Sequence, residues 1–306
     1  MRAIFWKELA DHFGRRRFTL LLGMAALGAV WGSFIDLQEM IRSGAGFFYL
    51  DLFTTRAGVP ISLLSFISFF GPVIGITLGF DSINGERTQG TLSRILAQPV
   101  YRDAVFNGKF LAGLLTLSIV LLSLGMSAVG VMMFRLGIPP SGDEVIRLTG
   151  FGLVGIGYLA FWLALAMTAS IYLRTAVASA LVSIGAWIAA SFFVTFAAII
   201  IADRIVPDIE TADDALRHFN VEQWVSRASP GALFSEATGI LLDPIGGRIL
   251  TPLVLSQDRL QGLLISPVSA GQSLQLVWPH IVVLVAMVAA LLAVSYVRFM
   301  REEIRS

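Results

Sequence analysis

The sequence predicts an all-α protein embedded in a membrane, with six transmembrane helices. Apolar side chains make up 56% of its 306 residues and charged ones only 14%, which is too apolar for a water-soluble fold. A bilayer core about 30 Å thick needs roughly 20 apolar residues for each spanning helix. The fourth and fifth apolar runs are separated only by Arg174, where we expect a hairpin; one continuous helix there would leave five spans. The runs cover residues 18–35, 60–80, 110–134, 148–173, 175–202 and 276–297.

Composition excludes several other classes of protein. The net charge is +1, and no basic stripe with interleaved aromatic side chains occurs, so nucleic acid is not an expected partner. Cysteine is absent, which excludes disulfides, thiolate metal sites and lipidated cysteines. Residues 1–17 are charged and no clear cleavage site follows the first apolar run, so we expect that run to remain as a span.

The distribution of lysine and arginine predicts the orientation. Cytoplasmic segments between spans carry an excess of these residues. With a cytoplasmic N-terminus, the short inside segments hold both lysines and most arginines, although the outside segments are longer in total. We therefore expect a multi-pass protein of the plasma (inner) membrane with both termini in the cytoplasm.

Residues 1–17 are predicted to form a helix that lies in the membrane interface. Apolar residues recur at helical spacing on one face and charged residues on the other, with Lys7 and Asp11 one turn apart. Helices of this pattern lie parallel to the membrane with the apolar face in lipid. The apolar set is Ala3, Trp6, Leu9, Ala10 and Phe13, and the charged set is Lys7, Glu8, Asp11 and Arg15.

Short helices are also predicted in the outside segment between the fifth and sixth spans, residues 203–275. Thr211 and Asp214 have the spacing of a capping box at the start of the first helix. A second helix is expected from Ser229–Pro230 to about Asp243. The apolar stretch 249–265 is broken by proline and by charge, so we expect it to lie at the surface or re-enter the membrane.

The main inside loop, residues 83–109, contains an unpartnered apolar face. Leu92, Ile95 and Leu96 stand at i, i+3 and i+4, which predicts a helix of about two turns that Pro99 ends. A helix this short, held at the membrane by the spans on either side, cannot bury that face alone. A groove on a partner protein would cover it. The alternative is packing on the chain's own N-terminal helix.

This loop resembles a known family. From residue 80 to residue 113 it reads FDSINGERTQGTLSRILAQPVYRDAVFNGKFLAG, similar to the inside loop of type-2 permeases of ATP-binding-cassette transporters. The stretches IFWKEL, SPGALFSEATGILLDP and FMREEIRS also resemble that family, particularly the branch with permeases for copper-enzyme maturation and gliding. The residues that match the loop pattern are Glu86, Gly90, Thr91, Leu92, Leu96, Pro99, Arg102 and Lys109.

The resemblance implies a non-catalytic subunit that couples ATP hydrolysis elsewhere to transport, usually export. ATP and Mg²⁺ would be bound by a separate ATPase, consistent with the lack of a GxxxxGK[ST] motif in the sequence. The implied partners are this ATPase, a second permease (an identical copy or a homologue), membrane lipid and an extracytoplasmic partner; no cofactor or metal is expected in the chain. The implied docking residues are Glu86, Arg87, Gly90, Thr91, Leu92, Arg94, Ile95, Leu96, Pro99 and Arg102.

Two helical faces are candidates for the translocation path or the subunit interface. On the second span a stripe of small residues falls within about 80° on a helical wheel, and on the fifth span polar residues recur every four positions. The resemblance implies that these two spans lie near the subunit boundary. The alternative is ordinary packing within one subunit, because small and hydroxyl residues commonly join membrane helices. The residues are Ser65, Ser68, Pro72, Gly75 and Gly79, and Ser183, Trp187, Ser191 and Thr195.

A membrane-embedded enzyme and an ion-coupled secondary transporter are the two alternative functions. His12, His218 and His280 lie in three separate regions and outside any HExxH motif, which argues against a metalloenzyme. The six apolar runs contain no Asp, Glu, Lys or Arg, which argues against a carboxylate proton relay. A sodium site built from backbone carbonyls would escape this second argument.

Overall fold

The computed structural model describes residues 2–14, 23, 50, 53, 62–90, 101–137, 139–207, 211–243 and 268–301. Within these ranges all regular elements are helices, and five segments are long and apolar enough to cross a membrane. They overlap the second to sixth predicted spans, whereas the first predicted span, 18–35, lies outside the described residues except for Gly23. The five segments are Leu63–Thr88, Arg102–Phe134, Gly142–Tyr172, Ala176–Ile205 and Ala270–Arg301.

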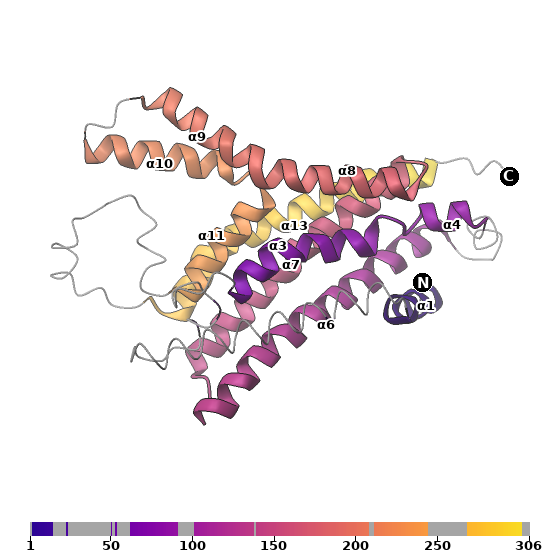
Figure 1. The fold of residues 1–306 in the computed structure, drawn as a ribbon, viewed down its shortest axis with the longest axis horizontal. Coiled ribbons are helices and arrows are strands. Elements are labelled where there is room, and N and C mark those ends of the chain that lie inside the picture. The colour runs from indigo at the N-terminus through magenta and orange to yellow at the C-terminus, as the bar shows by residue number, and fades with distance from the viewer. Residues whose placement is uncertain are drawn as a thin grey trace.

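The spanning segments form one bundle and alternate in direction along the chain (Figure 1). We name its two ends after the helices found there: the α4 end also holds α1 and the last turns of α13, and the α11 end holds the first turns of α7 and α13. The helices are α1 (Arg2–Gly14), α3 (Leu63–Gly79), α4 (Asn84–Thr88), α6 (Arg102–Leu136), α7 (Gly142–Tyr172), α8 (Ala176–Ile188), the π-helix η3 (Ala189–Phe193), α9 (Val194–Ile205), α10 (Ala212–Ser226), α11 (Pro230–Leu242) and α13 (Ala270–Arg301).

Local signals explain where several helices begin and end. The predicted break at Arg174 is confirmed, since Leu173 is extended and the Thr175 side chain caps α8 by accepting from the backbone N–H of Ala178. The predicted capping box of Thr211 and Asp214 is present at the start of α10. α6 ends at Gly137, whose positive φ of 70° suits glycine because it has no Cβ.

α7 lies at the centre of the bundle. In its most apolar window 72% of residues are buried, compared with 6% in the most apolar window of the segment Ala176–Ile205. Glycines allow α3 to approach α7 closely: a Cβ at Gly79 would lie 2.8 Å from the carbonyl oxygen of Leu163, and one at Gly75 would lie 3.2 Å from that of Leu159. The close approach permitted by the small residues of α3 is therefore made to a helix of the same chain.

α7 also satisfies a backbone group that Pro72 leaves without a partner. Proline has no N–H, so the carbonyl of Ser68, one turn earlier in α3, loses its helical hydrogen bond. The hydroxyl of Tyr158 donates to this carbonyl oxygen at 2.9 Å. Hydrogen bonds between membrane helices contribute about 0.6 kcal/mol on average and at most about 1.7 kcal/mol. This bond therefore joins α7 to α3 near the middle of both helices.

Candidate functional site

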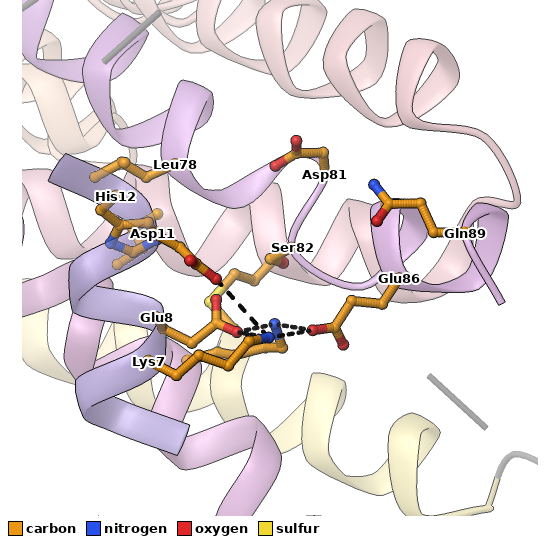
Figure 2. Close-up of a pocket in the computed structure, with 13 residues that line it drawn as sticks. Lys7, Glu8, Asp11, His12, Leu78, Asp81, Ser82, Glu86 and Gln89 are labelled. Carbon is orange, nitrogen blue, oxygen red and sulfur yellow. Dashed lines mark hydrogen bonds and ion pairs between the residues drawn. The ribbon is translucent and has the colours of Figure 1, made fainter. Parts of the chain in front are cut away.

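A buried ion cluster joins α1, α4 and α6 at the α4 end (Figure 2). The Nζ atom of Lys109 lies 2.7 Å from Glu8 Oε1 and 2.9 Å from Glu86 Oε1. The exposed fractions of the three side chains are only 4%, 8% and 13%, respectively. One lysine of α6 thus pairs with a carboxylate from the N-terminal helix and with another from the loop that follows α3.

Lys7 extends this cluster to the surface. Its Nζ atom lies 3.6 Å from Glu8 Oε1, 3.8 Å from Glu86 Oε1 and 3.8 Å from Asp11 Oδ2, which confirms the predicted pair of Lys7 and Asp11. Burial would raise the pKa of Glu8, but Lys109, together with Lys7 and His12, holds this pKa below its ordinary value. Glu8 is therefore held as a carboxylate.

α1 has a second polar contact with α6 and leaves its apolar side uncovered. Nδ1 of His12 lies 3.1 Å from the hydroxyl oxygen of Thr116. Trp6 and Phe13, in contrast, are exposed. This division suits a helix that faces the bundle with polar groups and the membrane with apolar ones, and the interfacial position stays a prediction.

Hydrogen bonds also fix the start of the loop to α7. The hydroxyl oxygen of Ser170 accepts from the backbone N–H groups of Ile83 and Asn84, both at 3.1 Å. The guanidinium of Arg87 donates to the carbonyl oxygen of Ile171, the next residue of α7, at 3.4 Å. α4 is thus attached to α1, α6 and α7 within a few residues.

A cavity of about 300 Å³ lies beside the ion cluster. Apolar side chains of α3 and α7 form one wall of this cavity. The side chains of four carboxylate residues and two lysines form the other wall. Among the described residues, no group of three or more His, Cys, Asp or Glu is arranged to hold a metal. The lining residues are Lys7, Glu8, Asp11, His12, Leu78, Asp81, Ser82, Gly85, Glu86, Gln89, Lys109, Leu163 and Met167.

The predicted docking residues lie partly within the described structure. Glu86 and Arg87 make the contacts given above. Gly90 has a φ of 65° and donates its N–H to the carbonyl of Arg87, so it turns the chain away from α4, and Arg102 begins α6. Thr91, Leu92, Arg94, Ile95, Leu96 and Pro99 lie outside the described residues.

The structure separates the residues predicted for the path or the subunit interface. In α3, Pro72, Gly75 and Gly79 are buried, and Ser65 and Ser68 are half-buried. In the fifth predicted span, Ser183 is buried and its hydroxyl donates to the carbonyl oxygen of Ser179. The rings of Trp187 and Phe69 are in contact, with their centroids 5.2 Å apart. Ser191 and Thr195 are exposed. Assignment of either face to a path or an interface stays a prediction.

Comparison with known proteins identifies the family. A family model described as "ABC-2 family transporter protein" matches residues 2–304. The chain belongs to this family. It is similar to two curated proteins described as "Probable ABC transporter permease protein NosY". The protein from Pseudomonas aeruginosa is 31% identical over 175 residues, covering 54% of this chain and 58% of the relative. The one from Stutzerimonas stutzeri is 30% identical over 136 residues, covering 43% and 45%.

The matches span only about half the length of these two relatives. Family membership and the five apolar helical segments together make this chain a multi-pass membrane permease of the ABC transporter class. The resemblance of the loop is thus confirmed at the level of the family.

Sequence reasoning missed the partners that hold Glu86. The sequence puts Glu8 on the polar face of the N-terminal helix and Lys109 in the loop pattern, and it connects neither residue with the other. The two are 101 residues apart, so no local spacing rule connects them. The opposite signs of the two charges were the only signal, because a charged side chain beside the end of a span is ordinarily expected to reach water.

Proposed function

We propose that this chain is the permease subunit of an ATP-driven transporter and that a separate ATPase, with bound ATP and Mg²⁺, docks on the loop 83–109. The observation that carries the proposal is the attachment of α4, directly before the short helix predicted to contain Leu92, Ile95 and Leu96, to three other helices. Lys109 joins it to α1 and α6, and Ser170 joins it to α7. A force applied by the ATPase to residues 91–99 would therefore act on all three helices rather than on a free loop.

The other proposed features follow from the family. A second permease, identical or homologous, would complete the transporter, and outward movement of the substrate is the direction that the resemblance implies. The segment Ala176–Ile205 offers a large exposed apolar surface to lipid or to that second permease, and it includes Ser191 and Thr195. Residues 203–275 would then lie outside, available to an extracytoplasmic partner.

Replacing Leu92 or Ile95 with aspartate tests the docking helix. A charge placed in an apolar groove is unfavourable, and a loss of about 1.4 kcal/mol lowers an affinity tenfold. We expect stimulation of the ATPase by the permease, and co-purification of the two, to fall by about that factor. Asn220→Asp, which adds the same charge at an exposed position of α10 away from this loop, should leave both unchanged. Full stimulation in both apolar-face variants would show that the ATPase docks elsewhere.

The proposed orientation can be tested with single cysteines, because the chain has none of its own. Ser43→Cys, Ser141→Cys and Ser226→Cys should react with a membrane-impermeant thiol reagent added to whole cells. Ser93→Cys, in the loop 83–109, should react only after the cells are made permeable. Labelling of position 93 in intact cells would reverse the orientation and place the loop out of reach of a cytoplasmic ATPase.

A further inference from the structure

α7 is bonded to its neighbours at three levels along its length. At the α4 end Ser170 holds the start of α4, and near the middle Tyr158 holds the carbonyl of Ser68 in α3. At the α11 end Arg147 holds α11 and α13. Ser170 and Arg147 are 23 residues apart, which corresponds to about 35 Å along a helix. This length exceeds a bilayer core of about 30 Å.

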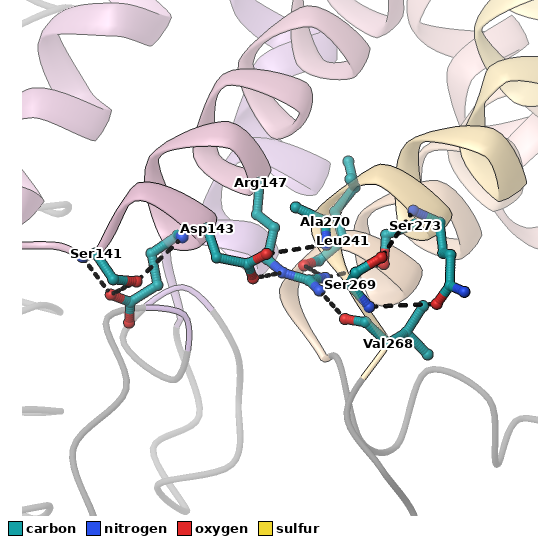
Figure 3. Close-up of polar contacts among 10 residues, drawn as sticks. Ser141, Asp143, Arg147, Leu241, Val268, Ser269, Ala270 and Ser273 are labelled. Carbon is teal, nitrogen blue, oxygen red and sulfur yellow. Dashed lines mark hydrogen bonds and ion pairs between the residues drawn. The ribbon is translucent and has the colours of Figure 1, made fainter.

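The contacts of Arg147 are the most extensive of the three (Figure 3). Its side chain is 1% exposed. It donates to Asp143 Oδ2 at 2.7 Å, to the carbonyl oxygen of Leu241 at 3.1 Å, to the hydroxyl of Ser273 at 2.9 Å and to the carbonyl oxygen of Val268. A buried guanidinium is tolerated when its donors are satisfied in this way. One side chain thus fastens the last turn of α11 and the first turn of α13 to α7.

Asp143 reinforces the same junction. Its second oxygen, Oδ1, accepts from the backbone N–H of Ala270 at the start of α13, at 2.9 Å. Further along, the ring of Tyr158 stacks on Phe234 of α11 with the centroids 4.5 Å apart, and Thr168 is hydrogen-bonded to Ser295 of α13 at 2.7 Å. α11 and α13 are therefore held to α7 at several heights and cannot slide along it without breaking these contacts.

The segment Ala176–Ile205 is different. Most of its residues are exposed, and its centre is the π-helical turn η3. A densely packed group of helices transmits displacement as a unit because its interior has little free volume, whereas a helix with few neighbours can move independently. α3, α7, α11 and α13 form the packed group, and α8 to α9 lie beside it.

We propose that α7 is the helix that transmits movement of the loop 83–109 across the membrane. Ser170 connects α7 to α4 at the end near this loop, and Arg147 positions α11 and α13 at the other end. This inference rests on the proposed function. Displacement of α4 by the ATPase would shift α7 along its axis, and α11 and α13 would follow because Arg147 fixes them to it.

Two single-cysteine reporters test this path in the complex of permease and ATPase reconstituted in lipid. Gln89→Cys lies at the end of α4 and Ser235→Cys on α11, and both positions are exposed. The rate of modification by a maleimide is measured with and without ATP, Mg²⁺ and vanadate. In the otherwise unchanged chain we expect nucleotide to alter both rates by about fivefold, the lower end of typical coupling between sites.

Ser170→Ala and Arg147→Met, each combined with one reporter, should separate the two responses. The rate at position 89 should still change with nucleotide, whereas the change at position 235 should fall to less than half, and Arg147→Lys should restore part of it. Ser118→Ala, which removes a hydroxyl that donates to the carbonyl of Leu114 in the same helix, is the matched control and should leave both responses intact. Ser170→Ala removes a single oxygen, so the test remains available if Arg147→Met does not fold.

The outcomes distinguish this inference from the proposed function. If nucleotide changes neither rate in the unchanged chain, the proposed function fails and the inference fails with it. If only position 89 responds, the loop is coupled to the ATPase but α7 does not carry the movement. The inference is also overturned if position 235 responds fully in both Ser170→Ala and Arg147→Met, or if these variants reduce the two responses equally, as a general loss of structure would.

Discussion

Replacing Lys109 with methionine should destabilise the protein by about 3 to 5 kcal/mol, the usual cost of removing one partner from a buried ion pair. The change removes the cation closest to two carboxylates, Glu8 and Glu86, at 2.7 and 2.9 Å. Methionine fills a similar volume, so the loss would come from the uncompensated charge rather than from a cavity. The unfolding transition in detergent, followed by tryptophan fluorescence, measures the effect.

Lys7→Met is the matched control for this prediction. Lys7 touches the same carboxylates, but its side chain is 55% exposed and its distances are 3.6 and 3.8 Å. Exposed ion pairs contribute at most about 1 kcal/mol, so this variant should remain close to the original stability. Equal losses in the two lysine variants would show that burial of Lys109 is not what makes its contacts important.

The same cluster predicts a pH dependence. The pKa of Glu8 in the folded protein is lower than its ordinary value of 4.5. The stability that this carboxylate contributes is therefore fully present above that value and is lost as the pH falls through the lowered pKa. The original chain should lose stability over this acidic range, and Lys109→Met should lose less because the interaction is already gone. Parallel pH profiles for the two proteins would contradict this assignment.

Much of the fold could be predicted because it depends on local sequence. Apolar runs long enough to span a bilayer coincide with five helical segments of the structure. The hairpin at Arg174 and the cap at Thr211 could also be predicted from the sequence, because each depends on residues within one helical turn. Hydropathy and capping are properties of a short stretch of chain, so a single sequence contains them.

The polar contacts could not be predicted because their partners are distant in sequence. Lys109 and Arg147 each stand one residue before a predicted apolar core, where charged side chains are expected to reach water, yet both are buried. Their partners, such as Glu8 and Leu241, are 101 and 94 residues away. The absence of charge within the predicted cores was a correct observation, but it did not show that the cations at their edges are buried.

The stripe of small residues on α3 illustrates the same limit. Its composition predicted that another helix comes close, but composition cannot say which helix. The structure shows α7 of the same chain in contact with Gly75 and Gly79. Internal packing, the alternative interpretation of the stripe, therefore accounts for these two residues, and a role in transport would have to be tested against it.

Gly79→Leu provides that test and should be strongly destabilising. A Cβ at this position would lie 2.8 Å from the Leu163 carbonyl oxygen and from Ala166 Cβ, and 3.1 Å from the Met167 nitrogen. Backbone atoms of a central helix cannot yield as a flexible side chain would, so α3 and α7 would have to separate. Overpacking of a core typically costs about 1 to 3 kcal/mol, and we expect the upper end here, measured by the same unfolding transition.

Gly130→Leu on α6 is the matched control, because a Cβ at Gly130 meets nothing within 4 Å. Removing a glycine from a helix there should be neutral or stabilising by up to about 1 kcal/mol. If Gly79 instead lines the translocation path, Gly79→Leu should be as stable as Gly130→Leu and should alter only transport. A large loss of stability confined to Gly79→Leu would show that the contact between α3 and α7 at Gly79 stabilises the packed group of α3, α7, α11 and α13.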